Sequence, residues 1–150
     1  MVMSSLQTRQ AIASDFNFVY ELHRQELFSY VEQTWGWFEE VQLNGMQSDF
    51  DNLPFEIISD RGKDIGVISV VDLENTLLLN YLAILRAYQR LGFGTQLLGK
   101  VLEQALDRGI PVKLKVMRVN PAKAFYERLG FVIANSDEAL LYMEWRHEKF

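Results

Sequence analysis

Two glycines lie between an apolar run and a predicted helix, in the segment Arg86-Ala87-Tyr88-Gln89-Arg90-Leu91-Gly92-Phe93-Gly94-Thr95. Glycine has no Cβ, so the backbone at Gly92 and Gly94 can take positive φ and let a ligand approach closely. The first N–H groups of the following helix have no partner within the helix, and the helix dipole adds partial positive charge there. This arrangement predicts a phosphate-binding turn.

Two common phosphate-binding patterns do not fit this turn. The dinucleotide fingerprint Gly-x-Gly-x-x-Gly requires a third glycine at position 97, where the chain has Leu97. A P-loop requires Gly-Lys-Ser/Thr, and Gly99-Lys100-Val101 does not supply it. The pattern that fits is Gln89-x-x-Gly92-x-Gly94. Taken alone, it is equally compatible with an ordinary strand-to-helix turn.

A second patterned segment, residues 120–131, predicts one complete short helix. Asn120 is a favoured N-cap, the proline that follows suits the first helical position, and Gly130 suits the left-handed residue after the helix. Tyr126 lies about 100° around the helix from its neighbour, at the margin of the apolar face, so its hydroxyl can reach a cleft. The apolar face itself is predicted to be core and carries Ala122, Phe125 and Leu129.

Together the two motifs resemble the GNAT superfamily of acyl-CoA-dependent N-acyltransferases. The pyrophosphate loop of that family reads Gln/Arg-x-x-Gly-x-Gly/Ala, which residues 89–94 match. Its closing signature has Asn, Tyr, Gly and Phe in the order found in residues 120–131, and one predicted strand separates the motifs, as here. The resemblance is close from Thr76 to Phe131 and otherwise extends only to the order of elements.

The predicted elements give the order β-α-α-β-β-β-α-β-α-β-β. The fold class is therefore α/β (mixed α+β), and the resemblance implies the GNAT fold, a central mixed sheet with helices on both faces. Because a helix intervenes, the strand at 112–116 should lie parallel to the central strand at 76–85. The other predicted elements are strands at 6–9, 55–59, 65–73, 132–134 and 140–145, a first helix capped by Ser14, and helices at 39–50 and 96–108.

The resemblance implies acetyl-CoA (coenzyme A) as the cofactor and assigns residues to it. In the family the central strand splays from its parallel neighbour, so its main chain binds the pantetheine arm and one N–H stabilises the thioester oxyanion. The same residues also suit plain core and capping roles. By position, the implied cofactor-binding residues are Leu82, Ala83, Ile84, Gln89, Arg90, Leu91, Gly92, Phe93, Gly94, Thr95, Asn120 and Phe125.

Tyr126 corresponds to the general acid of the family. A phenol with a pKa of about 10 stays protonated at neutral pH and can donate to a departing thiolate. The alternative is a half-buried helix tyrosine with a satisfied hydroxyl. The general base stays unassigned among Glu32, Glu39 and Glu40, whereas His23 is expected to be a packed residue.

The stretch from Tyr30 to Glu40 is densely aromatic and acidic and is predicted to lie between two helices. In the family this region covers the acceptor side of the cleft. Tryptophans beside carboxylates can hold a cationic amine by cation–π and charge attraction, whereas an aromatic cluster that packs the helices is an equal alternative. The substrate-binding candidates are Tyr30, Glu32, Trp35 and Trp37.

Composition sets further limits. The 150 residues, 49% hydrophobic and 23% charged, predict one globular domain over 1–150. A net charge of −5 argues against a nucleic-acid partner, and the lack of cysteine excludes thiolate sites. The two histidines lie far apart and form no metal pattern. With no 18-residue apolar run and no signal-peptide layout, we expect a cytoplasmic enzyme without a membrane partner.

Three classes of function remain after these considerations. The leading one is an N-acetyltransferase that transfers an acetyl group from acetyl-CoA to a primary amine of a small molecule or peptide by direct attack. The alternatives are a non-catalytic acyl-CoA-binding module and a protein-interaction domain on the same fold. The C-terminal strands offer an edge for a homodimer.

Overall fold

The computed structural model describes residues 5–147. Its strands are β1 (Leu6–Gln10), β2 (Glu56–Asp60), β3 (Lys63–Asp72), β4 (Leu77–Ile84), β5 (Val112–Met117), β6 (Val132–Ser136) and β7 (Leu140–Trp145). Its helices are α1 (Phe16–Trp35), α2 (Glu39–Asn52), α3 (Phe93–Arg108) and α4 (Ala122–Arg128), with short 3-10 turns at Ala13–Asp15 and Arg86–Tyr88. The element order predicted from the sequence is confirmed.

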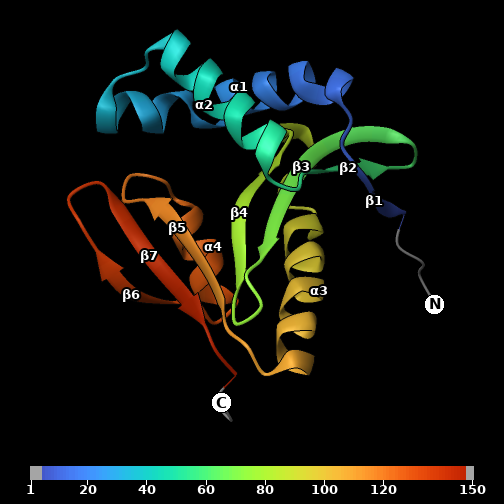
Figure 1. Ribbon diagram of the computed structural model, residues 1–150, viewed down its shortest axis with the longest axis vertical. Coiled ribbons are helices and arrows are strands. Elements are labelled where there is room, and N and C mark those ends of the chain that lie inside the picture. Colours follow the sequence, from blue (N-terminus) through green and yellow to red (C-terminus); the bar gives the residue numbers. More distant parts are fainter. Residues whose placement is uncertain (1–4, 148–150) are drawn as a thin grey trace.

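The strands form one mixed sheet in the order β1-β2-β3-β4-β5-β7-β6 (Figure 1). Among the described strands, only β4 and β5 are parallel, as expected for a pair joined through α3. They pair at Leu77 with Val112 and at Leu78 with Lys113, and then separate. In Figure 1 the two strands diverge toward α1 and α2. The second half of β4 therefore has a strand neighbour only on its β3 side.

Two buried clusters cover the two faces of the sheet. One joins α3 and α4 to the strands through residues such as Leu98, Val101 and Phe131. The other joins α1 and α2 to β2, β3 and β4 through residues such as Leu22 and Met46. Burying apolar side chains on both faces is what holds the strands at their observed separation.

The start of α1 differs from the prediction. Ser14 lies in the 3-10 turn, and Asp15 is the residue that precedes the helix. The Asp15 carboxylate accepts hydrogen bonds from the Ile12 N–H (2.8 Å) and from two nitrogens of Arg9 (2.8 and 2.9 Å). Chiefly because of the Arg9 hydrogen bond, the pKa of Asp15 lies below its usual value. A contact to the first strand, which local sequence does not reveal, fixes this helix start.

Two other boundaries are also wrong in the sequence-based prediction. The long helix begins at Phe93 rather than Gln96, so Gly94 lies in its first turn. Helix α1 continues to Trp35 and α2 begins at Glu39, so most of the aromatic and acidic stretch is helical, and only residues 36–38 connect the helices. Gly36, with φ of 81°, ends α1.

The close pairing of β3 with β4 gives a test of the fold. A Cβ at Gly66 would lie 2.6 Å from the Ala83 carbonyl oxygen and 3.2 Å from the Ile84 Cα. Gly66→Ala should therefore force the strands apart and lower the free energy of unfolding by about 1–3 kcal/mol. Gly45→Ala, in α2 with open space around its Cβ, is the control and should be neutral or stabilise by up to about 1 kcal/mol. Urea unfolding of both variants measures this, and equal effects would contradict it.

Candidate active site

A groove opens where β4 and β5 separate. Its volume is about 470 Å³, and its walls come from α1, the end of β4, the loop before α3, and α4. Of the predicted cofactor and catalytic residues, the groove is lined by Leu82, Ala83, Ile84, Gln89, Arg90, Gly92, Gly94, Thr95, Asn120, Phe125 and Tyr126. Leu91 and Phe93 do not line it, because Leu91 is 62% exposed and Phe93 packs against the core. The two sequence motifs thus meet in one cavity.

Of the two glycines that could take positive φ, Gly92 does so and Gly94 does not. Gly92 has φ of 87°, and a Cβ there would meet no heavy atom within 4 Å, so the space in front of it is open. Gly94 is helical, and a Cβ there would approach the Phe125 ring to 3.1 Å. Gly92 therefore allows the turn into α3, and Gly94 allows α4 to pack beside it.

The side chain of Gln89 ties the loop to two neighbouring elements. Its Nε2 donates to the Ile84 carbonyl oxygen (2.7 Å) and to a carboxylate oxygen of Glu26 on α1. Gln89 was expected only as one of the implied cofactor-binding residues, and this side-chain bridge was not predicted.

Several other residues of the groove were also missed. They are Glu26, Leu27, Tyr88, Pro121, Ala122 and Arg128. Helical spacing could have indicated Glu26, because it lies four residues before Tyr30 and so shares its face of α1.

Tyr126 faces the groove from α4 and is 8% exposed. Its ring makes edge contacts with Phe125 (5.3 Å between centroids) and Phe131 (5.7 Å). Burial raises the pKa of Tyr126 to about 12. The side-chain oxygen of Asn120 accepts a hydrogen bond from the Ala122 N–H (2.9 Å), so Asn120 has its predicted capping role as well as a place in the groove. With this pKa the phenol keeps its proton at neutral pH and can donate a hydrogen bond to a group in the groove.

The substrate-binding candidates are separated by the structure. Tyr30 lines the groove, whereas Glu32, Trp35 and Trp37 lie outside its lining. The Trp37 ring packs 5.0 Å from Phe28 and 5.6 Å from His23. This position matches the alternative in which the aromatic residues pack the two helices.

A buried polar network lies beneath α1. His23 Nδ1 is 2.8 Å from the Tyr81 hydroxyl, and His23 Nε2 is 2.8 Å from the Gln42 side-chain oxygen. Since Gln42 presents an acceptor, Nε2 carries the proton and Nδ1 accepts from Tyr81. Burial lowers the pKa of His23, which is a packed residue as expected from the sequence.

All three carboxylates considered as a base lie outside the groove lining, Glu32 as described above. Glu39 accepts hydrogen bonds from Tyr20 (2.9 Å), Arg24 (2.5 Å) and Trp37 (2.7 Å). With the Arg24 hydrogen bond as the main cause, the pKa of Glu39 falls to about 2. Neither Glu39 nor Glu40 lines the groove. A carboxylate held by three donors away from the cavity is poorly placed to take a proton from a substrate.

Neither a metal site nor a membrane-spanning helix is present among the described residues. No group of three or more histidine, aspartate or glutamate side chains within residues 5–147 could hold a metal ion. Across the same residues, no helix has both the length and the apolar character needed to cross a membrane.

An open helix start beside two splayed parallel strands is the arrangement expected of acyl-CoA transferases of the resembled family. Comparison with known proteins agrees with this class. The family model described as "Acetyltransferase (GNAT) domain" matches residues 52–133, more than half of the chain. The chain therefore belongs to the GNAT acetyltransferase family.

Individual relatives show how far the similarity extends. The [ribosomal protein bS18]-alanine N-acetyltransferase of Haemophilus influenzae is 43% identical over 51 residues, which span 33% of this chain and 35% of that protein. The PaiA N-acetyltransferase of Thermoplasma acidophilum, solved with coenzyme A, has a TM-score of 0.74 at 20% identity, covering 95% of this chain and 99% of that one. The ribosomal-protein-S18-alanine N-acetyltransferase of Escherichia coli has a TM-score of 0.68 at 19% identity, covering 97% and 98%. At these identities the structures establish the shared fold.

The lowered pKa of His23 predicts a pH dependence of stability. At pH values below 6.5, the usual pKa of histidine, His23 binds a proton more readily in the unfolded chain than in the folded one. The contribution of His23 to the free energy of unfolding is therefore full above pH 6.5 and is lost as the pH falls. The free energy of unfolding should therefore decrease on acidification by up to about 1.4 kcal/mol per pH unit from this group. His23→Gln should be less stable at neutral pH and have a shallower dependence. Denaturant titrations of both proteins at several pH values measure this, and parallel profiles would contradict it.

Proposed function

We propose that this protein is an N-acetyltransferase that transfers the acetyl group of acetyl-CoA to a primary amine of a small molecule or peptide. The observation that carries the proposal is the meeting, in one groove, of the unpaired side of β4, the start of α3 and the Tyr126 phenol. Family membership supports it, as does the coenzyme A bound in the related Thermoplasma structure.

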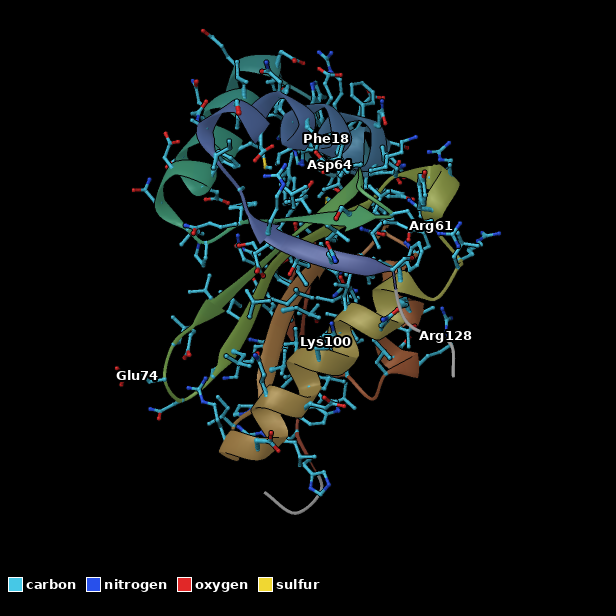
Figure 2. The ribbon with its side chains drawn as sticks, turned by 90° about the vertical axis from the view of Figure 1, so that its right-hand side faces the viewer. Phe18, Arg61, Asp64, Glu74, Lys100 and Arg128 are labelled. Atoms are coloured by element: carbon cyan, nitrogen blue, oxygen red, sulfur yellow. The ribbon has the colours of Figure 1, made fainter. Side chains whose placement is uncertain are left out.

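The residues of the groove fit coenzyme A in three ways. The open space at Gly92 leaves room for a diphosphate against the first N–H groups of α3. Arg90 and Arg128 bring positive charge to the same groove, and Figure 2 shows Arg128 at the edge beside the loop that leads into α3. The β5-facing side of Leu82 to Ile84 leaves main-chain groups for the amides of a pantetheine chain.

The chain contributes to acetyl transfer chiefly by position and by hydrogen bonding. The thioester supplies an activated acetyl group and a thiolate leaving group. A main-chain N–H in the segment Leu82 to Ile84 would stabilise the negative charge that develops on the thioester oxygen. The acceptor would attack as the free amine, after its ammonium form has lost a proton to water in the groove. Tyr126 would donate its proton to the sulfur as the carbon–sulfur bond breaks and the carbon–nitrogen bond forms, and the proton that the nitrogen then sheds would return, through water, to the phenolate. The groove would hold the two reactants together, an effect worth several kcal/mol.

The acceptor is proposed to be a primary amine, and the relatives suggest where to begin. The named activity of the Haemophilus and Escherichia proteins is acetylation of an alanine of a ribosomal protein. A peptide with a free N-terminal alanine therefore belongs in the amine panel, together with putrescine and lysine. Release of free thiol from acetyl-CoA with any of these would distinguish an enzyme from a CoA-binding module.

Removing the phenol tests the catalytic assignment. Tyr126→Phe should lower kcat by roughly a hundredfold, because the thiolate would depart without a proton donor, while calorimetry should give an unchanged Kd for CoA. Tyr142→Phe is the control, since this exposed phenol on β7 binds Asp137 outside the groove. Turnover of Tyr126→Phe at the wild-type rate would remove Tyr126 as the acid.

A further inference from the structure

One carboxylate lies in the wall of the groove. Among the described residues that line it, Glu26 is the only acidic one, and it comes from the middle of α1. Its side chain is 15% exposed, so it is mostly withdrawn from water although it borders a cavity. A partly buried carboxylate is stabilised only if hydrogen-bond donors or a cation reach it.

The partners of Glu26 within the described chain are few. Gln89 donates to Oε1. The charge partner on the other oxygen is Arg86, whose guanidinium nitrogen lies 4.0 Å from Oε2, and that arginine is 83% exposed. An ion pair of this length with an exposed arginine is weak. Oε2 is therefore available to a stronger donor that enters the groove.

The negative charge of Glu26 affects the pKa of Tyr81 on β4. After burial, which has the larger effect, the Glu26 carboxylate is the second cause that raises the pKa of Tyr81. Tyr81 directly precedes Leu82, the first of the β4 residues that line the groove. The charge of Glu26 therefore acts across the space between α1 and this part of β4.

We propose that Glu26 binds the ammonium group of the acceptor and makes the enzyme selective for cationic amines. This rests on the proposed acetyltransferase function. Glu26 lies on α1 and reaches the loop through Gln89, the residue before Arg90. Glu26 is the acidic side chain that the groove offers to an ammonium, whereas Arg90 and Arg128 are the basic side chains that it offers to a diphosphate. A carboxylate gives an ammonium a charge-assisted hydrogen bond, roughly twice as strong as a neutral one.

The competing explanation is that Glu26 only holds Gln89 in place. Two variants separate the explanations. Glu26→Gln removes the charge and keeps the size of the side chain, whereas Gln89→Ala removes the bridge and keeps the charge. Glu21→Gln is the control, because it removes one negative charge from an exposed position of the same helix.

The experiment measures thiol release from acetyl-CoA with putrescine, lysine and a short peptide bearing a free N-terminal alanine. For the best of these amines, Glu26→Gln should raise KM by about tenfold or more. Its Kd for CoA, measured by calorimetry, should stay within about twofold of the wild-type value. Glu21→Gln should match the wild type, and Gln89→Ala should weaken CoA binding without the same rise in KM for the amine.

A comparison without mutation covers the case in which Glu26→Gln does not fold. Two analogues of the best substrate are compared as inhibitors of the wild type. In one, a hydroxyl replaces the reacting amine; in the other, a tertiary or quaternary ammonium that cannot react replaces it. The inhibition constant of the alcohol should be at least about tenfold higher than that of the ammonium analogue. Equal inhibition would overturn the inference, as would an unchanged KM in Glu26→Gln or an equal rise in Gln89→Ala. Absence of thiol release by the wild type with every amine would instead overturn the proposed function, and the inference with it.

Discussion

The separation of β4 from β5 is the constraint on which the rest of the structure depends. The two strands share only two residue pairs, although β4 pairs with β3 along its whole length and β5 pairs with β7 along its whole length. The sheet is thus two antiparallel units joined at one narrow point. Backbone groups on the β5-facing side of β4 are left for another partner, since buried main-chain polar groups are almost always paired. A ligand with amides of its own can pair with them as an added strand would.

The helices maintain this separation. α1 and α2 bury apolar residues against β2, β3 and β4, while α3 and α4 bury theirs on the opposite face. α3 also connects the end of β4 to the start of β5, so its first turn lies at the open end of the split, where Gly94 and Thr95 line the groove. Gly92 allows the turn, and Gln89 fixes it to β4 and α1. The gap between β4 and β5 and the glycine loop that precedes α3 both follow from the path of this one segment.

Features of the fold and the groove could be predicted from the sequence where they depend on residues that are neighbours in the chain. The order of elements, the glycine loop and the Asn120 to Phe131 helix were predicted because periodicity and capping act over a few residues. The side-chain bridge from Gln89 to Glu26 was not, because the two residues are 63 positions apart and meet only in the folded chain. Residue type favoured Ser14 as the cap of α1, whereas Asp15 is the residue before the helix and its side chain is held by Arg9 of the first strand. The fold could therefore be predicted more fully than the side-chain contacts that join distant parts of the chain at the groove.

The electrostatics of the groove add an asymmetry that the motifs alone do not contain. Burial raises the pKa of Tyr126, so its phenol stays neutral at neutral pH. Burial also lowers the pKa of His23, on the buried side of α1, so this side chain is expected to be neutral as well. The acidic and basic side chains of the lining are Glu26, Arg90 and Arg128. In a partly desolvated cavity charges act more strongly than in water. The two arginines would attract an anionic diphosphate and Glu26 would attract a cationic amine, so both reactants would be drawn into the groove that holds the phenol.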